Sequence, residues 1–295
     1  MSSSTIRRRP RRSAQRGDRA GYAFVGGYVV LLLAFGVVPV VYSLWLSITN
    51  AAGQFVGLGN FTRVATDYRF FASFGHVMLY LIQWLVVLLV LVLTLALMLH
   101  GRMRRTTKVL RFLYYLPGAF AGAVSVLIWT ILLDPAASPA GGLLQAFGWA
   151  SSNEVLQRDH LPTIFMLIAF WAGAGSWIVI MYGALNGVPL EVIEAARIDG
   201  ANTWQIAFRI QIPLLRRWIA YMLILGFAGG MQVFVEPQML QNVAGRSWSP
   251  NQLSYSFAFG AADLNGAAAI AVYLMVISLA CAMLVVFKAR LFEKE

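Results

Sequence analysis

Six long hydrophobic segments alternate with shorter polar ones along the 295 residues of the chain. Each is close to the roughly 20 residues that an α-helix needs to cross a bilayer. Three of them contain an internal proline, which marks a kink or an end of the helix. These prolines do not rule out a membrane-spanning helix, because neighbouring helices can satisfy the backbone groups that proline leaves unpaired. The prolines are Pro39, Pro117 and Pro237, and the segments are 22–46, 77–99, 112–133, 162–185, 218–240 and 267–287. This pattern predicts an all-α, polytopic membrane protein with six transmembrane helices.

One long polar segment with a helical pattern, 189–213, lies between the fourth and fifth hydrophobic segments. Pro189 suits the first position of a helix. Leu190, Ile193 and Ala196 then fall on one stripe at helical spacing. A short amphipathic helix is expected here.

A turn and a second helix are expected after this first helix. Gly200 supplies the permissive backbone that the end of a helix requires. Asn202 or Thr203 can cap the second helix. The segment 189–213 is therefore predicted to be a helix, a glycine turn and another helix.

The first of these helices has the residue types of a docking surface. Ala195 and Ala196 add no bulk, so another surface can approach closely, and Glu194 and Asp199 offer charged contacts at the margin. An ordinary helical connector that packs only on its own bundle is the alternative, and residue types do not decide between the two.

Composition agrees with a membrane protein. Hydrophobic residues make up 59% of the chain, above the roughly 45–50% of soluble domains. The net charge of +11 is divided among short segments between apolar runs, whereas nucleic-acid binding needs a contiguous basic face. Cys281 is the only cysteine, which excludes an internal disulfide and a cysteine metal cluster.

The basic residues predict the orientation in the membrane. Residues 1–20 hold seven arginines and almost nothing apolar, so they are expected to form a disordered tail that can attract anionic lipid headgroups. With this tail in the cytoplasm, 19 of the 23 lysines and arginines lie on the cytoplasmic side. Both termini and a loop at 186–217 are then cytoplasmic, and 21–295 form one transmembrane domain.

No pattern indicates catalysis or a resident cofactor. A phosphate-binding loop needs Gly-Lys followed by Ser or Thr, and none of the three lysines follows a glycine. The histidines His76, His100 and His160 never stand four residues apart as metal-binding pairs do. The chain is therefore expected to have no catalytic residue, no metal site and no cofactor of its own.

A polar stripe is expected in the fifth hydrophobic segment. Glu236 is its notable ionisable residue, and such residues are rare inside membranes. Gln232 precedes it by one helical turn, and Gly229 and Gly230 thin the backbone nearby. Either a translocation path or a helix-packing seam would look like this.

The fourth hydrophobic segment carries aromatic residues beside small ones. Trp171 and Trp177 offer flat faces, while Gly173 and Ser176 leave gaps next to them. Such faces can stack on a sugar, although tryptophan near interfaces and small residues at helix contacts are also common for structural reasons.

The spacing Glu-Ala-Ala, three residues, Gly, nine residues, Ile, one residue, Ile-Pro resembles the cytoplasmic EAA loop of binding-protein-dependent ABC importer permeases. Its residues here are Glu194, Ala195, Ala196, Gly200, Ile210, Ile212 and Pro213. Ile212 stands where the family usually has Leu. The run around this motif is similar to the carbohydrate branch, the permeases of the maltose type, and the likeness extends over about residues 22–292.

The resemblance implies a pore-forming subunit of the bacterial cell membrane that imports a sugar or related polyol by alternating access. It implies a second permease subunit as a heterodimer, two ATP-binding-cassette subunits that bind ATP and Mg, and an extracytoplasmic solute-binding protein. The residues expected to couple to the ATPase are Glu194, Ala195, Ala196, Asp199 and Gly200. Another importer substrate class is the alternative, and a stand-alone secondary transporter or channel is a further one.

Overall fold

The computed structural model of the chain describes residues 22, 25–100 and 104–288. These residues are mostly helical, and their one isolated β-bridge joins Thr49 to Phe55. The all-α prediction is confirmed for this part of the chain. The predicted tail, 1–20, lies outside the described residues.

Five helical stretches are long and apolar enough to cross a membrane. They are Val25–Ser47, Tyr68–Leu99, Arg158–Leu185, Arg216–Met239 and Leu264–Lys288. A sixth forms only if two helices that meet at an angle of 102°, Val109–Phe120 and Ala123–Leu132, make up one span. Five or six spans are consistent with the six predicted.

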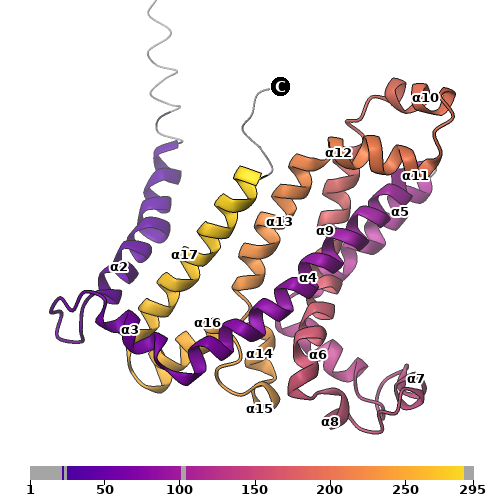
Figure 1. Ribbon diagram of the computed structural model, residues 1–295. Helices are drawn as coiled ribbons and strands as arrows, with labels where there is room; N and C mark the ends of the chain where they lie inside the picture. The colour runs from indigo at the N-terminus through magenta and orange to yellow at the C-terminus, as the bar shows by residue number, and fades with distance from the viewer. Residues whose placement is uncertain (1–21, 23–24, 101–103, 289–295) are drawn as a thin grey trace, which may run out of the picture.

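The spans contain the following helices, of which Figure 1 labels all but η1 and η2. In chain order these are η1 (Leu33–Val37), α2 (Val38–Ser47), α4 (Tyr68–His100), α5 (Arg104–Tyr115), η2 (Leu116–Phe120), α6 (Ala123–Leu132), α9 (Leu161–Leu185), α13 (Arg216–Met231), α14 (Val235–Met239) and α17 (Leu264–Lys288).

Short helices fill the connections. They are α3 (Gly59–Ala65), α7 (Gly141–Ala146), α8 (Ser152–Val155), η3 (Arg158–His160), α10 (Leu190–Ile198), α11 (Thr203–Ile206), η4 (Ala207–Gln211), α12 (Ile212–Leu214), α15 (Gln241–Ala244), α16 (Pro250–Tyr255) and η5 (Ser256–Gly260).

The third hydrophobic segment, 112–133, is bent near Pro117, where a kink or an end is predicted. Pro117 lies in the 3-10 helix η2, where its missing N–H interrupts the α-helical ladder. Gly122 follows with φ +77°, a left-handed conformation that glycine adopts without steric cost. The chain therefore turns sharply between α5–η2 and α6.

The fifth hydrophobic segment, 218–240, is interrupted shortly before Pro237, where a kink or an end is predicted. Helix α13 ends at Met231, and α14 begins only at Val235. Pro237 cannot donate a hydrogen bond to the carbonyl four residues earlier, which favours a break at this place. Gln232 and Glu236 consequently lie on either side of a break instead of on one face of a helix.

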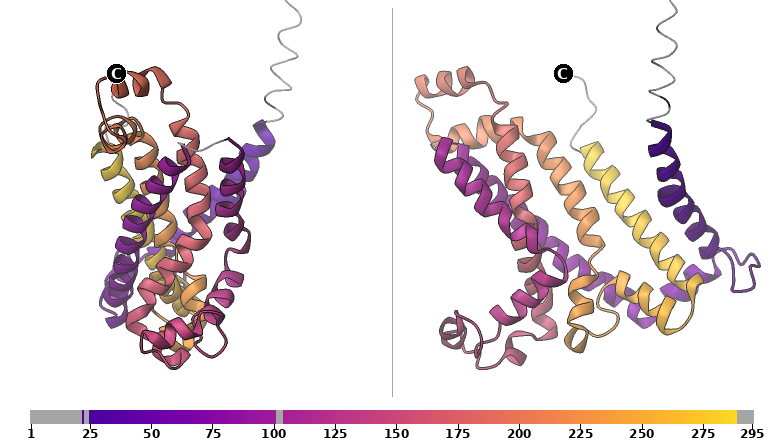
Figure 2. Two further views of the ribbon diagram at one scale, coloured as in Figure 1. Left: turned by 90° about the vertical axis from the view of Figure 1, so that its right-hand side faces the viewer. Right: turned by 180° about the vertical axis from the view of Figure 1, so that it is seen from behind.

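The long helices form a flat bundle with two ends. Helices α2, α17, α13 and α9 follow one another across the molecule, and α4 packs along α9 and α13 (Figures 1 and 2). The segment α10–α12 and the end of α17 lie at one end of the bundle, and α3, α7, α8 and α14–α16 lie at the other (Figure 1).

The core lies between α4, α9, α13 and the connection that contains α16. Trp84, Phe165 and Trp248 are among its large buried side chains. In the first span, by contrast, no residue of the most apolar window is buried within the chain. That helix packs on the rest of the chain mainly through α17 and leaves most of its apolar surface exposed.

Candidate functional site

Helix α10, the first helix of the predicted docking segment, is attached to the molecule by a small apolar cluster. Its Ile193 is buried against Val188 and Ile206. Pro189 precedes the helix as its N-cap residue instead of occupying the first helical position. Ala196 packs on this cluster, but Leu190 is 66% exposed, so the predicted apolar stripe is buried only in part.

The turn after α10 has the predicted form. Gly200 has φ +82°, in the left-handed region where a side chain would be strained. Asn202 accepts a hydrogen bond from the backbone N–H of Gln205 at 2.9 Å, and the Gln205 side chain accepts one from the backbone N–H of Asn202 at 2.8 Å. This reciprocal capping box starts α11. The helix, glycine turn and second helix are confirmed, with Asn202 as the cap.

The exposed face of α10 carries a mixed apolar and acidic stripe. Leu190, Glu194 and Ile198 follow at intervals of four residues, which places them on one side of the helix. Ile198 is 87% exposed. Neither of the two ion pairs within the described residues involves Glu194. Two exposed aliphatic side chains on either side of a carboxylate, beside the small Ala195, suit contact with another protein.

Helix α9 brings its predicted residues to two different neighbours. Trp171 stacks on Phe120 of η2 with ring centroids 6.5 Å apart. Trp177 meets Tyr221 of α13 edge to face at 6.1 Å. Ser176 lies between them and is exposed. The two tryptophans therefore connect α9 to η2 and to α13.

Two of the glycines predicted to line the substrate path contact a side chain of α4 that the sequence analysis did not single out. A Cβ on Gly173 would lie 3.5 Å from the indole of Trp84. A Cβ on Gly230 would also lie 3.5 Å from this ring, but its closest neighbour would be Cδ2 of Leu81. Trp84 is buried, and it fills the space between α9 and α13. Trp84 could not be predicted from the sequence, because only the tertiary structure shows that it faces glycines on two other spans.

The remaining predicted residues lie at the end of α13 and beyond it. Gly229 faces open space. The side-chain oxygen of Gln232 accepts a hydrogen bond from the Asn251 amide at 3.1 Å, and Glu236 is half-buried in α14. Gly229, Gln232 and Glu236 therefore lie around the break between α13 and α14, and Asn251 at the beginning of α16 contacts it.

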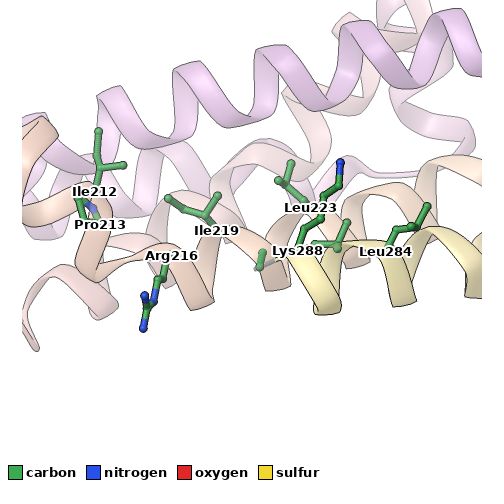
Figure 3. Close-up of a pocket in the computed structure, with 9 residues that line it drawn as sticks. Ile212, Pro213, Arg216, Ile219, Leu223, Leu284 and Lys288 are labelled. Carbon is green, nitrogen blue, oxygen red and sulfur yellow. The ribbon is translucent and has the colours of Figure 1, made fainter. Parts of the chain in front are cut away.

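A groove of about 620 Å³ lies between α13 and α17, near the end of the bundle that carries α10 (Figure 3). Its walls are aliphatic, with Ile219 and Leu223 from α13 and Leu284 from α17. Arg216 and Lys288 extend to opposite sides of it (Figure 3). Its lining contains no aromatic or amide side chain, so it lacks the groups that recognise a sugar.

No group of three His, Cys, Asp or Glu side chains within the described residues could hold a metal ion.

The family model that matches this chain is "Binding-protein-dependent transport system inner membrane component", over residues 93–293. The alpha-glucoside transport system permease protein AglF of Rhizobium meliloti (strain 1021) is 32% identical to this chain over 266 residues, which cover 87% of this chain and 78% of the relative. The arabinooligosaccharides transport system permease protein AraP of Bacillus subtilis (strain 168) is 26% identical over 272 residues, 90% of this chain and 87% of the relative.

A solved structure has the same fold. It is a bacterial alginate ABC transporter in complex with an alginate pentasaccharide-bound periplasmic protein. The matched chain superposes with a TM-score of 0.79 at 19% identity, over 93% of this chain and 95% of that chain. The resemblance inferred from the EAA spacing is confirmed, and so is the multi-pass location in the bacterial cell membrane. The chain belongs to the inner membrane components of binding-protein-dependent transport systems, the permease subunits of ABC importers.

Proposed function

We propose that this chain imports a sugar or related polyol by alternating access, as one of two permease subunits of its transporter. The observation that carries the proposal is the EAA segment, which folds into a helix, a glycine turn and a capped second helix with an exposed stripe on α10. The sugar assignment is supported by the alpha-glucoside and arabinooligosaccharide permeases among the relatives.

The coupling segment, 186–217, docks on the ATPase through α10. In this proposal Glu194 contacts the ATPase, Ala195 and Ala196 allow its close approach, and Asp199 and Gly200 hold the turn. Asp199 is the C-cap residue of α10, and Gly200 has the positive φ of the turn. ATP and Mg are bound by the partner subunits, and this chain contributes no catalytic residue and no cofactor.

The end of the bundle that carries α10–α12 faces the cytoplasm in this proposal, together with both termini and the tail 1–20. The coupling segment belongs to one transmembrane domain, 21–295. The excess of lysine and arginine on the segments of that side supports the orientation. The outer end then holds α3, α7, α8 and α14–α16 (Figure 1).

Two surfaces suit the partner proteins. The first span buries none of its most apolar window within the chain, which supports packing against a second, different permease subunit. The outer connections receive a solute-binding protein, by analogy with the alginate transporter that was solved with its periplasmic protein.

The substrate path follows α9 and the break after α13. The residues proposed to line or shape it are Trp171, Gly173, Ser176, Trp177, Gly229, Gly230, Gln232 and Glu236. Gly173 and Gly230 both contact Trp84, and Gly230 leaves room for Leu81. The exposed Gln232 and the half-buried Glu236 at the break support a path here, because polar and ionisable side chains within a span often mark a substrate pathway.

The coupling proposal is tested on the stripe of α10. The chain is co-expressed with its partner subunits. We expect the variants Ile198→Ser and Glu194→Ala to insert normally into the membrane, but to retain less of the ATPase in the purified complex and to import less sugar. Val192→Ser is the matched control, since Val192 is exposed on the same helix but lies away from the stripe. Gly200→Pro is expected to abolish uptake, and full uptake by that variant would contradict the coupling role.

A further inference from the structure

A second hollow, of about 570 Å³, lies at the opposite end of the bundle from α10, and the proposed path does not use it. Its wall comes from the beginning of α4, from α14 and α15, and from the α16–η5 connection. The lining is mixed, with aromatic rings, two glutamines and two arginines. This composition contrasts with the aliphatic groove of Figure 3.

The aromatic part of this outer hollow is a pair of exposed rings. Tyr255 and Phe259 stand four residues apart with their ring centroids separated by 4.8 Å. Phe234 packs behind Tyr255 at 5.5 Å. Tyr255 is 44% exposed and Phe259 is 75% exposed. Rings held in place by a neighbour and open on one side offer a flat apolar surface to a ligand.

The polar part consists of the side chains of Gln238, Gln241 and Arg246. The oxygen of Gln238 accepts a hydrogen bond from the Gln252 amide at 3.3 Å, and Gln252 is itself buried. This bond orients the Gln238 amide and leaves its NH₂ group as a donor. Gln241 and Arg246 are exposed and add further donors.

Arg69 completes the wall, and its charge is already compensated. Its Nε and Nη2 donate to the two carboxylate oxygens of Asp67 at 2.9 and 2.7 Å. The guanidinium also lies 5.3 Å from the ring centre of Phe257. Arg69 is therefore held in one geometry, and the adjacent Asp67 carboxylate disfavours a second carboxylate at this position.

We propose that this outer hollow is a saccharide-binding site that takes one glycosyl unit of an uncharged oligosaccharide. The C–H face of the sugar ring stacks on Tyr255 and Phe259, and its hydroxyl groups accept hydrogen bonds from Gln238, Gln241 and Arg246. Small-molecule sites typically combine an apolar wall with a few polar groups, and the polar groups set the orientation and the specificity of the ligand. The inference rests on the proposed import of a sugar, and it adds a first binding step at the outer end.

The site is tested by saturation-transfer NMR on the full chain in lipid nanodiscs, with maltose, cellobiose and sucrose as probes. Signals are expected for at least one probe with the unmodified chain. Phe259→Ala and Gln241→Ala should each weaken its binding by about tenfold. Phe55→Ala is the matched control, because Phe55 is 72% exposed on another connection at the same end and lies outside the hollow. Tyr255→Phe keeps the ring and should retain binding.

Unchanged binding in both Phe259→Ala and Gln241→Ala would overturn the site, as would the absence of signal from every probe. Stronger binding of an acidic disaccharide than of its neutral counterpart would overturn the uncharged ligand class. Sugar uptake by the complete complex is measured in parallel. Sugar uptake by the unmodified complex that persists while the hollow fails these tests removes only this inference. Absence of both probe binding and sugar uptake in the unmodified protein removes the proposed function as well.

Discussion

Arg63 and Asp263 lie 200 residues apart in the chain, and their side chains form an ion pair with Nη1 and Oδ2 2.5 Å apart. Asp263 also accepts a hydrogen bond from the backbone N–H of Gly266 at 2.9 Å, which caps the beginning of α17. One carboxylate therefore joins α3 to the start of the last span, at the end of the bundle opposite α10 (Figure 1).

The first prediction concerns the separate contributions of these two contacts of Asp263 to the stability of the folded chain. Asp263→Ala removes the ion pair and the cap and is expected to lower stability by about 1–2 kcal/mol. Asp263→Asn keeps a capping oxygen and removes the charge, so it should cost less, up to about 1 kcal/mol, because Arg63 is half exposed. The apparent melting temperature of the purified chain in detergent measures the difference. Equal losses in the two variants would contradict the capping role.

The same carboxylate predicts a pH dependence. Burial opposes ionisation of Asp263, but the bonds from Arg63 and from the Gly266 N–H outweigh it, so the pKa of Asp263 lies below its usual range. The folded protein consequently binds this proton less well than the unfolded chain. The stabilisation is complete above the ordinary carboxyl pKa of about 4 and is lost as the pH falls through the lower folded value.

Melting temperatures at pH 6, 4 and 3 test this sign. The stability difference between the unmodified chain and Asp263→Asn should be largest at pH 6 and shrink toward pH 3. Asp67, whose pKa is also lowered by its bond with Arg69, is present in both proteins, so its effect cancels in the comparison. A difference that grows on acidification would contradict the argument.

Asn265 makes a second connection at the outer end. Its buried Nδ2 donates to the carbonyls of Leu46 and Thr49 at 3.0 and 2.8 Å. The substitution Asn265→Asp would place hydrogen-bond acceptors against these carbonyl oxygens. We expect it to lower the stability of the folded chain by about 1–3 kcal/mol, a larger loss than that caused by the apolar substitution Asn265→Leu. The exposed Asn242→Asp is the control and should be neutral. Limited proteolysis near residue 50 reports whether the first span loosens, and an unchanged cleavage rate in Asn265→Asp would contradict its role as a tie.

Much of the architecture could be predicted because hydrophobic run length is a direct signal of a span. The second span nevertheless begins at Tyr68 instead of residue 77, because Arg69 and Ser73 interrupt the apolar run although both are helical. The breaks at Gly122 and after Met231 were harder to predict, since proline and glycine show where a helix can bend and only packing decides whether it does.

The candidate site was predicted unevenly for a similar reason. The coupling segment depends on local signals, namely the glycine turn and the cap at Asn202, which the sequence displays directly. The neighbours of α9 and α13 depend on tertiary contacts, so Trp84 stayed hidden within a uniformly apolar run. The outer hollow combines Arg69 with residues about 170 positions later in the chain, and no local pattern joins them.

Replacing two different glycines of α9 by alanine is expected to change the stability of the folded chain in opposite directions. A Cβ on Gly175 would overlap the backbone carbonyl of Tyr114 in α5, whereas a Cβ on Gly183 would meet nothing within 4 Å. Gly175→Ala must push the backbones apart and is expected to cost about 1–3 kcal/mol or more. Gly183→Ala should be neutral or stabilise by up to about 1 kcal/mol, because alanine favours helix. Melting temperatures of the two variants decide, and a stable Gly175→Ala would contradict the close contact of α5 with α9.

The break between α13 and α14 carries the last prediction. Gln232 and Glu236 lie on its two sides, and Gln232 is tied to Asn251 by a bond of 3.1 Å. If the break lines the substrate path, Gln232→Ala and Glu236→Gln should each lower uptake by about tenfold or more, because one lost substrate hydrogen bond costs about 1–2 kcal/mol.

Uptake and melting temperature must be measured together on the same preparations of these variants. A path residue lowers uptake with little change in stability, whereas a packing residue lowers the melting temperature first. Gln145→Ala, an exposed glutamine in α7 away from the break, is the control and should change neither quantity. Normal uptake with reduced stability in both Gln232→Ala and Glu236→Gln would show that the break is a packing seam, and the path would then have to follow α9 alone.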